Sequence, residues 1–189
     1  MALTIPNRFT NGQTIDAVKF NSNFDAISAW ASGIDTDLDT AEAAIDAIEA
    51  GYGSGAFFAY AGASDQSISA TTYTTVTLSD TGTDAFDTSS YFASNVYTPT
   101  VAGAYHFAVN LHVLTSGFAD AETVNVYITK NTSTRYQVAS LLGTNARGCS
   151  GSIILKANGT TDTFKVEVYA SGDLSIDYAQ FSGFCVKPD

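Results

Sequence analysis

The 189-residue sequence is poor in cysteine, proline and basic residues, with two cysteines, three prolines and eight lysines and arginines. Cys149 and Cys185 are too few and too far apart for a disulfide framework or a metal knuckle, so we expect reduced side chains that fill the core. The basic residues do not cluster, and 19 acidic residues give a net charge of −11. Because phosphate backbones and anionic membrane surfaces are bound by grouped cations, nucleic acid and membranes are excluded as partners.

Long apolar runs are also missing. No stretch of about 18 apolar residues occurs, and the start of the chain has no apolar segment typical of a secretory signal. We therefore expect neither a membrane span nor this route of export. With 45% hydrophobic and 12% aromatic residues, the chain can still bury a substantial core. A charged fraction of only 14% favours a β-rich fold with a neutral polar surface.

A glycine-rich segment, residues 51–55, separates two kinds of sequence pattern. Before it, apolar residues recur at helical spacing, whereas after it they alternate with threonine, serine and tyrosine as in strands. Pro6 and the Asn11-Gly12 turn signal predict an extended arm over residues 1–19. Thr14 is the predicted cap of the helix that follows, with Asp16 near the positive end of its dipole.

Between residues 20 and 52 the apolar positions alternate intervals of four and three residues, which is a heptad pattern. We call these positions the heptad stripe: Phe24, Ala31, Leu38, Ile45 and Tyr52 at position a, and Phe20, Ile27, Ile34, Ala41 and Ile48 at position d. Isoleucine at d favours three or four strands over two. Ser32-Gly33 in the middle instead favours a helix pair that folds back on its own domain, so both arrangements remain open.

After residue 56 the sequence contains a series of short aromatic or β-branched segments separated by glycine, asparagine or aspartate. They span residues 72–78, 105–114, 123–129, 137–142, 152–156, 163–169 and 178–186. Such a series without a helical pattern predicts a mainly β fold, a sandwich or jelly roll. Asn158-Gly159 lies between two of the segments and is expected to turn a hairpin.

One stretch of this region resembles a known family. Residues 97–107, Tyr-Thr-Pro-Thr-Val-Ala-Gly-Ala-Tyr-His-Phe, are similar to the signature of the complement 1q-type globular head, a jelly roll related to tumour necrosis factor. Residues 56–60 resemble its opening strand and residues 181–184 its closing strand. The resemblance implies a jelly-roll head over residues 56–189 and a homotrimer, because such heads are typically homotrimers. It implies these core residues: Tyr97, Gly103, Tyr105, Phe107, Phe181, Gly183 and Phe184.

The beginning of the chain resembles a second group. Residues 5–12, followed by Asn21-Ser22-Asn23-Phe24-Asp25-Ala26-Ile27, are similar to the opening of bacteriophage fibre and virion-decoration proteins. This resemblance implies a virion protein, assembled in the host cytoplasm, with other virion proteins of the capsid or tail as partners. The candidate anchoring residues are Ile5, Pro6, Arg8 and Phe9. The candidate trimer contacts of a helical stalk over residues 20–52 are Ile27, Ile34, Leu38, Ala41, Ile45 and Ile48.

Catalytic signals are weak, so we expect no enzyme and no cofactor. Residues 148–152, Gly-Cys-Ser-Gly-Ser, lack the last glycine of a hydrolase elbow. His106 and His112 are about 20 Å apart on one strand, too far to share a metal ion. Asp84 and Asp87 are candidates for Ca²⁺ binding, as in some members of the family that the head resembles, but such turns are usually only solvated.

The remaining functional question concerns what the head contacts. The loop aromatics Tyr91, Phe118 and Tyr136 are candidate contacts for a host-surface saccharide or protein. A fibre for host attachment is the first hypothesis, and a capsid decoration or cement protein that stabilises the shell is the alternative. A polysaccharide depolymerase is disfavoured because 189 residues leave no room for a long β-helix.

Overall fold

The computed structural model describes residues 3–4, 6, 11–12, 14, 16–51, 55–61, 65–114, 122–143 and 148–189, with the backbone alone for residues 47–51. The chain divides into two units, Met1–Glu49 and Ala50–Asp189. Several residues singled out in the sequence lie outside the described part: Ile5, Arg8, Phe9, Tyr52, Phe118 and the side chain of Ile48. Among the described residues, no helix is both long and apolar enough to span a membrane.

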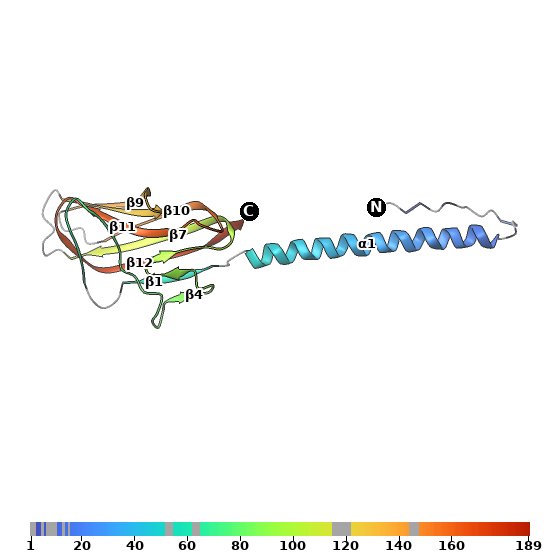
Figure 1. Ribbon diagram of the computed structural model, residues 1–189, viewed down its shortest axis with the longest axis horizontal. Coiled ribbons are helices and arrows are strands. Elements are labelled where there is room, and N and C mark those ends of the chain that lie inside the picture. Colours follow the sequence, from blue (N-terminus) through green and yellow to red (C-terminus); the bar gives the residue numbers. More distant parts are fainter. Residues whose placement is uncertain are drawn as a thin grey trace. The chain divides into compact units, whose positions relative to one another are not determined.

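The first unit is built around one helix, α1 (Ala17–Gly51), which Figure 1 shows as a single unbroken coil. Asp16 caps it, rather than Thr14 as predicted. The Asp16 carbonyl accepts from the Phe20 N–H at 2.9 Å, and its Oδ1 accepts from the Val18 N–H at 2.9 Å. A carboxylate is well suited to this place because it pairs with free N–H groups at the positive end of the dipole.

The helix continues through Ser32 and Gly33 without a break. The alternative prediction of two helices that separate at this point is therefore wrong. A glycine inside a helix costs only about 1 kcal/mol relative to alanine, which a helix of 35 residues tolerates.

The second unit is a β-sandwich, and all of its strand pairs are antiparallel. Its strands are β1 (Phe57–Tyr60), β2 (Gln66–Ile68), β3 (Tyr73–Thr75), β4 (Phe86–Asp87), β5 (Phe92–Ala93), β6 (Val96–Tyr97), β7 (Ala102–Val113), β8 (Thr123–Lys130), β9 (Thr134–Leu142), β10 (Gly148–Asn158), β11 (Phe164–Ala170) and β12 (Leu174–Pro188). The first sheet has the order β10-β7-β12-β1-β4, with β2 paired to β12. The second has the order β5-β6-β11-β8-β9, with β3 paired to β11.

The predicted hairpin at Asn158-Gly159 is wrong, because β10 belongs to the first sheet and β11 to the second. Side chains close this turn between the sheets. Asn158 Oδ1 accepts from the N–H groups of Thr160, Thr161 and Asp162 at 2.9–3.0 Å. Asp162 Oδ2 accepts in return from the Asn158 N–H at 2.8 Å. These bonds take the place of the cross-strand bonds of a hairpin.

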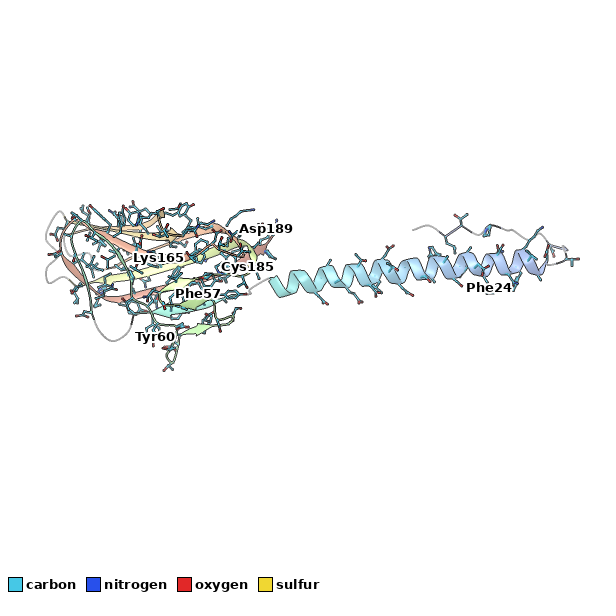
Figure 2. All side chains as sticks on the ribbon, in the orientation of Figure 1. Phe24, Phe57, Tyr60, Lys165, Cys185 and Asp189 are labelled. Carbon is cyan, nitrogen blue, oxygen red and sulfur yellow. The ribbon has the colours of Figure 1, made fainter. Side chains whose placement is uncertain are left out.

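Aromatic side chains fill the space between the sheets. Phe57 stacks on Tyr97 with ring centroids 4.3 Å apart and meets Phe181 edge to face at 4.9 Å. Phe107 lies 4.6 Å from Phe164. All of these rings are fully buried, and Figure 2 labels Phe57 within the head. The buried Tyr97 hydroxyl donates to the Gly55 carbonyl at 2.7 Å, so the ring enters the core without an unpaired polar group.

Phe184 is not part of this core, contrary to the expectation from the family resemblance. It is 45% exposed and lies 5.4 Å from the His106 ring. The reason is the period of two in a strand. Phe181, Gly183 and Cys185 point inward on β12, so Phe184, three residues after Phe181, points outward.

Both cysteines are free. Cys185 is buried and Cys149 is partly buried against the core. Burial raises the pKa of both thiols, which favours their protonated form over the nucleophilic thiolate.

The packing around Gly183 is predicted to leave no room for a side chain at this position. A Cβ at this position would lie 2.7 Å from Phe107 Cδ1 and 2.9 Å from both Phe57 Cε1 and the His106 carbonyl. Gly183→Ala is therefore expected to lower the free energy of unfolding by about 1–3 kcal/mol, measured by urea denaturation. Gly148→Ala is the control, because its Cβ would come no closer than 3.4 Å to another residue. Equal stability of the two variants would contradict the described packing.

Candidate functional site

The helix exposes its heptad stripe. Six of its large apolar side chains are 40–54% exposed: Phe20, Phe24, Ile27, Ile34, Leu38 and Ile45. Phe20 and Phe24 contact each other edge to face at 4.7 Å, and Figure 2 labels Phe24 on α1. Ala41, also on the stripe, is exposed as well. A stripe of apolar side chains in water is unfavourable until another surface covers it.

Acidic residues flank this stripe. Asp35, Asp37, Asp39, Glu42 and Asp46 are all exposed, and Lys19 is the one basic residue within α1. Neighbouring helices of this composition would repel each other at low ionic strength. Apolar contacts along the stripe therefore have to overcome charge repulsion.

The outer face of the first sheet, hereafter the first-sheet face, also exposes large apolar side chains. The strand register places Ile154 opposite His106, and His106 opposite Phe184. The neighbouring row runs from β10 to β4 and consists of Ser152, Ala108, Ser182, Phe58 and Phe86. Ile154, Phe86 and Phe184 are each about half exposed.

Small side chains between these bulky ones leave a shallow depression of about 350 Å³ in the first-sheet face. Its lining includes Phe58, Ala108, Asn110, Ser152, Gln180 and Ser182. It is open to solvent, whereas small-molecule sites are usually enclosed by apolar walls. The depression is therefore better suited to a side chain from another protein surface.

The histidines on this face have separate partners. His112 Nδ1 is 2.6 Å from Asp177 Oδ1, while His106 lies beside Phe184. In the described part of the chain, no three histidine, cysteine, aspartate or glutamate residues are grouped so that they could hold a metal ion.

The two aspartates considered for Ca²⁺ differ in their surroundings. Both Asp87 oxygens accept backbone hydrogen bonds, from the N–H groups of Ser89 at 3.2 Å and Phe92 at 2.7 Å. Asp84 is exposed. Asp87 therefore stabilises its own turn.

Of the predicted loop aromatics, Tyr91 and Tyr136 are partly buried against the core. The Tyr91 ring lies 6.0 Å from Tyr97, and its hydroxyl accepts a hydrogen bond from Thr100 Oγ1. Tyr136 is opposite the buried Ile128 on β8 and faces inward. The two tyrosines are therefore held by the core and do not form a common site.

The structure instead groups three other tyrosines, which we call the tyrosine cluster: Tyr73 on β3, Tyr127 on β8 and Tyr169 on β11. The Tyr73 ring lies 5.5 Å from Tyr127 and 5.0 Å from Tyr169. The guanidinium carbon of Arg135 is 3.8 Å from the centre of the Tyr73 ring. The cluster lies on the outer face of the second sheet. Strand alternation could have placed Tyr127 and Tyr169 outward, but the pairing of β3 with β11 has no signal in the sequence.

A buried carboxylate lies within this face. Glu167 is only 4% exposed, with Lys165 Nζ 2.7 Å from Oε1 and Arg135 Nε 2.7 Å from Oε2. Thr129 Oγ1 also donates to Oε2, at 2.8 Å. Burial by itself would raise the pKa of Glu167, but the bonds from Lys165, Thr129 and Arg135 outweigh it and hold the pKa below its usual value.

Glu167→Gln is expected to lower the free energy of unfolding at pH 7 by about 2 kcal/mol, because two cations lose their shared partner. A lowered pKa in the folded state stabilises the protein above the unfolded pKa of about 4.3, and this stabilisation is lost as the pH falls through the folded pKa. The difference in the free energy of unfolding between wild type and variant, measured by urea denaturation, should therefore become smaller below about pH 4. Asp84→Asn, at an exposed carboxylate, is the control. A difference that did not change with pH would contradict the described ionisation of Glu167.

Comparison with known proteins identifies the fold of the head. No family model matches the chain, and no curated protein matches it in sequence. The globular domain of a zebrafish complement 1qA protein is similar with a TM-score of 0.51 and 17% identity, over 71% of this chain and 99% of that one. Vertex protein P5 of PRD1 is similar with a TM-score of 0.51 and 15% identity, over 72% of this chain and 99% of that one. The chain therefore carries a sandwich of the complement 1q type, the fold to which its residues 97–107 pointed.

Proposed function

We propose that the chain is a non-enzymatic structural protein of a bacteriophage virion, a short homotrimeric fibre. In this proposal, the part of the predicted arm that precedes α1, residues 1–16, anchors it to the particle, α1 forms a stalk, and the sandwich is presented to the host surface. The likeness of the head to the phage vertex protein P5 supports the virion setting, together with the resemblance of residues 5–12 to phage fibre proteins. Pro6, the one described candidate for the anchor, is exposed.

The observation that carries the proposal is that each of the two units exposes an ordered apolar surface. On α1 it is the heptad stripe, and on the head it is the first-sheet face. Covering half-exposed side chains of this size contributes about 1 kcal/mol each. Further copies of the chain are the partners that the stripe favours, because a heptad pattern is complementary to itself.

A trimer would cover both the heptad stripe and the first-sheet face. Ile27, Ile34 and Ile48 at position d favour more than two strands, and heads of the complement 1q type are typically trimers. A rotational arrangement would seat the bulky side chains of one first-sheet face against the depression of the next and close into a ring. Three linked heads would bind a repetitive host surface with an avidity about 10²–10⁴ times that of one head.

Charged substitutions on the two surfaces should dissociate the trimer. Phe184→Glu and Ile34→Asp each bury a charge in a proposed contact, so we expect the mass in sedimentation equilibrium at micromolar concentration to fall toward that of one chain. Leu142→Glu, at a residue 62% exposed on the second sheet, and Val18→Asp, 75% exposed and outside the stripe, are the matched controls. An effect of the controls equal to that of the test variants would contradict the assignment of the two surfaces.

Removal of residues 1–13 should leave a folded protein that no longer enters the particle. The reason is that residues 1–13 precede α1 and none of the described residues among them belongs to the head core. The measurement is the number of copies per purified virion, with circular dichroism as the control for folding. Normal incorporation would refute the anchor. In the intact virion a few to tens of copies are expected, whereas hundreds would refute the attachment fibre in favour of shell decoration.

A further inference from the structure

The outer face of the second sheet has an ordered arrangement of side chains. Two rows cross β3, β11, β8 and β9 in register: Tyr73, Tyr169, Asn125 and Ser140 in one, and Thr75, Glu167, Tyr127 and Gln137 in the other. Tyr73 reaches across this face, since its ring meets both Tyr127 on β8 and Arg135 on β9. The face is thus organised by the tyrosine cluster and not by separate surface residues.

The Tyr73 ring is held in place and yet accessible. One of its two faces lies against the Arg135 guanidinium, which is fixed in turn by its 2.7 Å bond to Glu167. Tyr73 is 42% exposed, so part of its ring surface remains accessible to a ligand although Tyr127 and Tyr169 also contact the ring. A ring that is already immobilised loses little conformational freedom when it stacks on a ligand.

Two amide side chains neighbour the tyrosine cluster, because the strand register places Asn125 opposite Tyr169 and Gln137 opposite Tyr127. Asn125 Oδ1 accepts from Gln137 Nε2 at 3.2 Å and from Ser140 Oγ at 2.9 Å. Both bonds use the same oxygen, so they orient the Asn125 amide and leave its N–H groups, together with Gln137 Oε1, for another partner. The face therefore offers oriented donors and acceptors beside a stacking surface.

The charges on this face favour a neutral ligand. The cations of Arg135 and Lys165 share the carboxylate of Glu167, so they are already engaged. The chain as a whole carries a net charge of −11, which repels anions. Arg135 and Lys165 outnumber the one carboxylate between them, and this local positive charge disfavours a cationic ligand.

The few exposed apolar side chains on this face favour a saccharide over a protein as its partner. Among the described residues of this face, the large exposed apolar side chains are Tyr73 and, at its edge, Leu142. Protein interfaces have an apolar centre, which the first-sheet face has and this face does not. Tyrosine rings with amides beside them match a pyranose, whose C–H faces stack on rings and whose hydroxyl groups exchange hydrogen bonds.

We propose that the tyrosine cluster, with Asn125 and Gln137, is a binding site for a neutral saccharide. This inference rests on the proposed attachment function and assigns its ligand to a sheet face, not to the loops. Since the first-sheet face is the proposed contact between copies, the second sheet stays accessible in the trimer. Each trimer then presents three equivalent sites.

The test is titration calorimetry of the full chain with neutral hexasaccharides of glucose, mannose and N-acetylglucosamine, and with a hexamer of galacturonate. At least one neutral hexasaccharide should bind, and better than the galacturonate hexamer. Tyr73→Ala and Asn125→Ala should each weaken that binding about tenfold or more, while Tyr73→Phe, which keeps the ring, should weaken it less. Leu142→Ala is the matched control and should bind as wild type does.

The proposal is overturned if no neutral hexasaccharide binds, if the galacturonate hexamer binds better, or if Tyr73→Ala and Asn125→Ala bind as wild type does. Two variants are used because Tyr73 also packs on Arg135, a partner of Glu167, and urea denaturation shows whether each remains folded. Sedimentation of the same samples separates this inference from the proposed function. A trimer that binds none of the saccharides refutes the binding site alone, whereas a monomer refutes the fibre.

Discussion

The aromatic contacts around Phe57 constrain the whole head. Phe57, Tyr97, Phe107 and Phe181 come from four strands of both sheets and pack ring against ring without access to water. Once these rings are inward, the period of two in each strand decides the direction of every neighbouring side chain. The chemistry of the two outer faces is therefore a consequence of how the core is filled.

The two faces differ in a way that suits different partners. The first-sheet face combines half-exposed Ile154, Phe86 and Phe184 with a depression lined by small residues, which favours contact with a protein surface. The second-sheet face carries tyrosines, amides and basic side chains that form ion pairs with Glu167. This composition favours a polar ligand. Together with the exposed heptad stripe on α1, this division is compatible with the proposed self-association through one face and with ligand access to the other.

Much of the fold could be predicted because it depends on local periodicity. The heptad intervals predicted the helix, and alternation predicted the strands from β7 to β12. The direction of Phe184 also follows from alternation, but the family motif grouped it with Phe181 and misplaced it. The turn at Asn158 could not be assigned, because a hairpin and a crossing between sheets use the same residues. The tyrosine cluster depends on the pairing of β3 with β11, a long-range contact without a local pattern.

Self-association in threes is the claim on which the fibre depends. Native mass spectrometry of the unmodified chain at micromolar concentration tests it most directly. We predict a dominant species of three times 19.8 kDa that persists at physiological ionic strength. A dominant species of 19.8 kDa under these conditions would contradict the account.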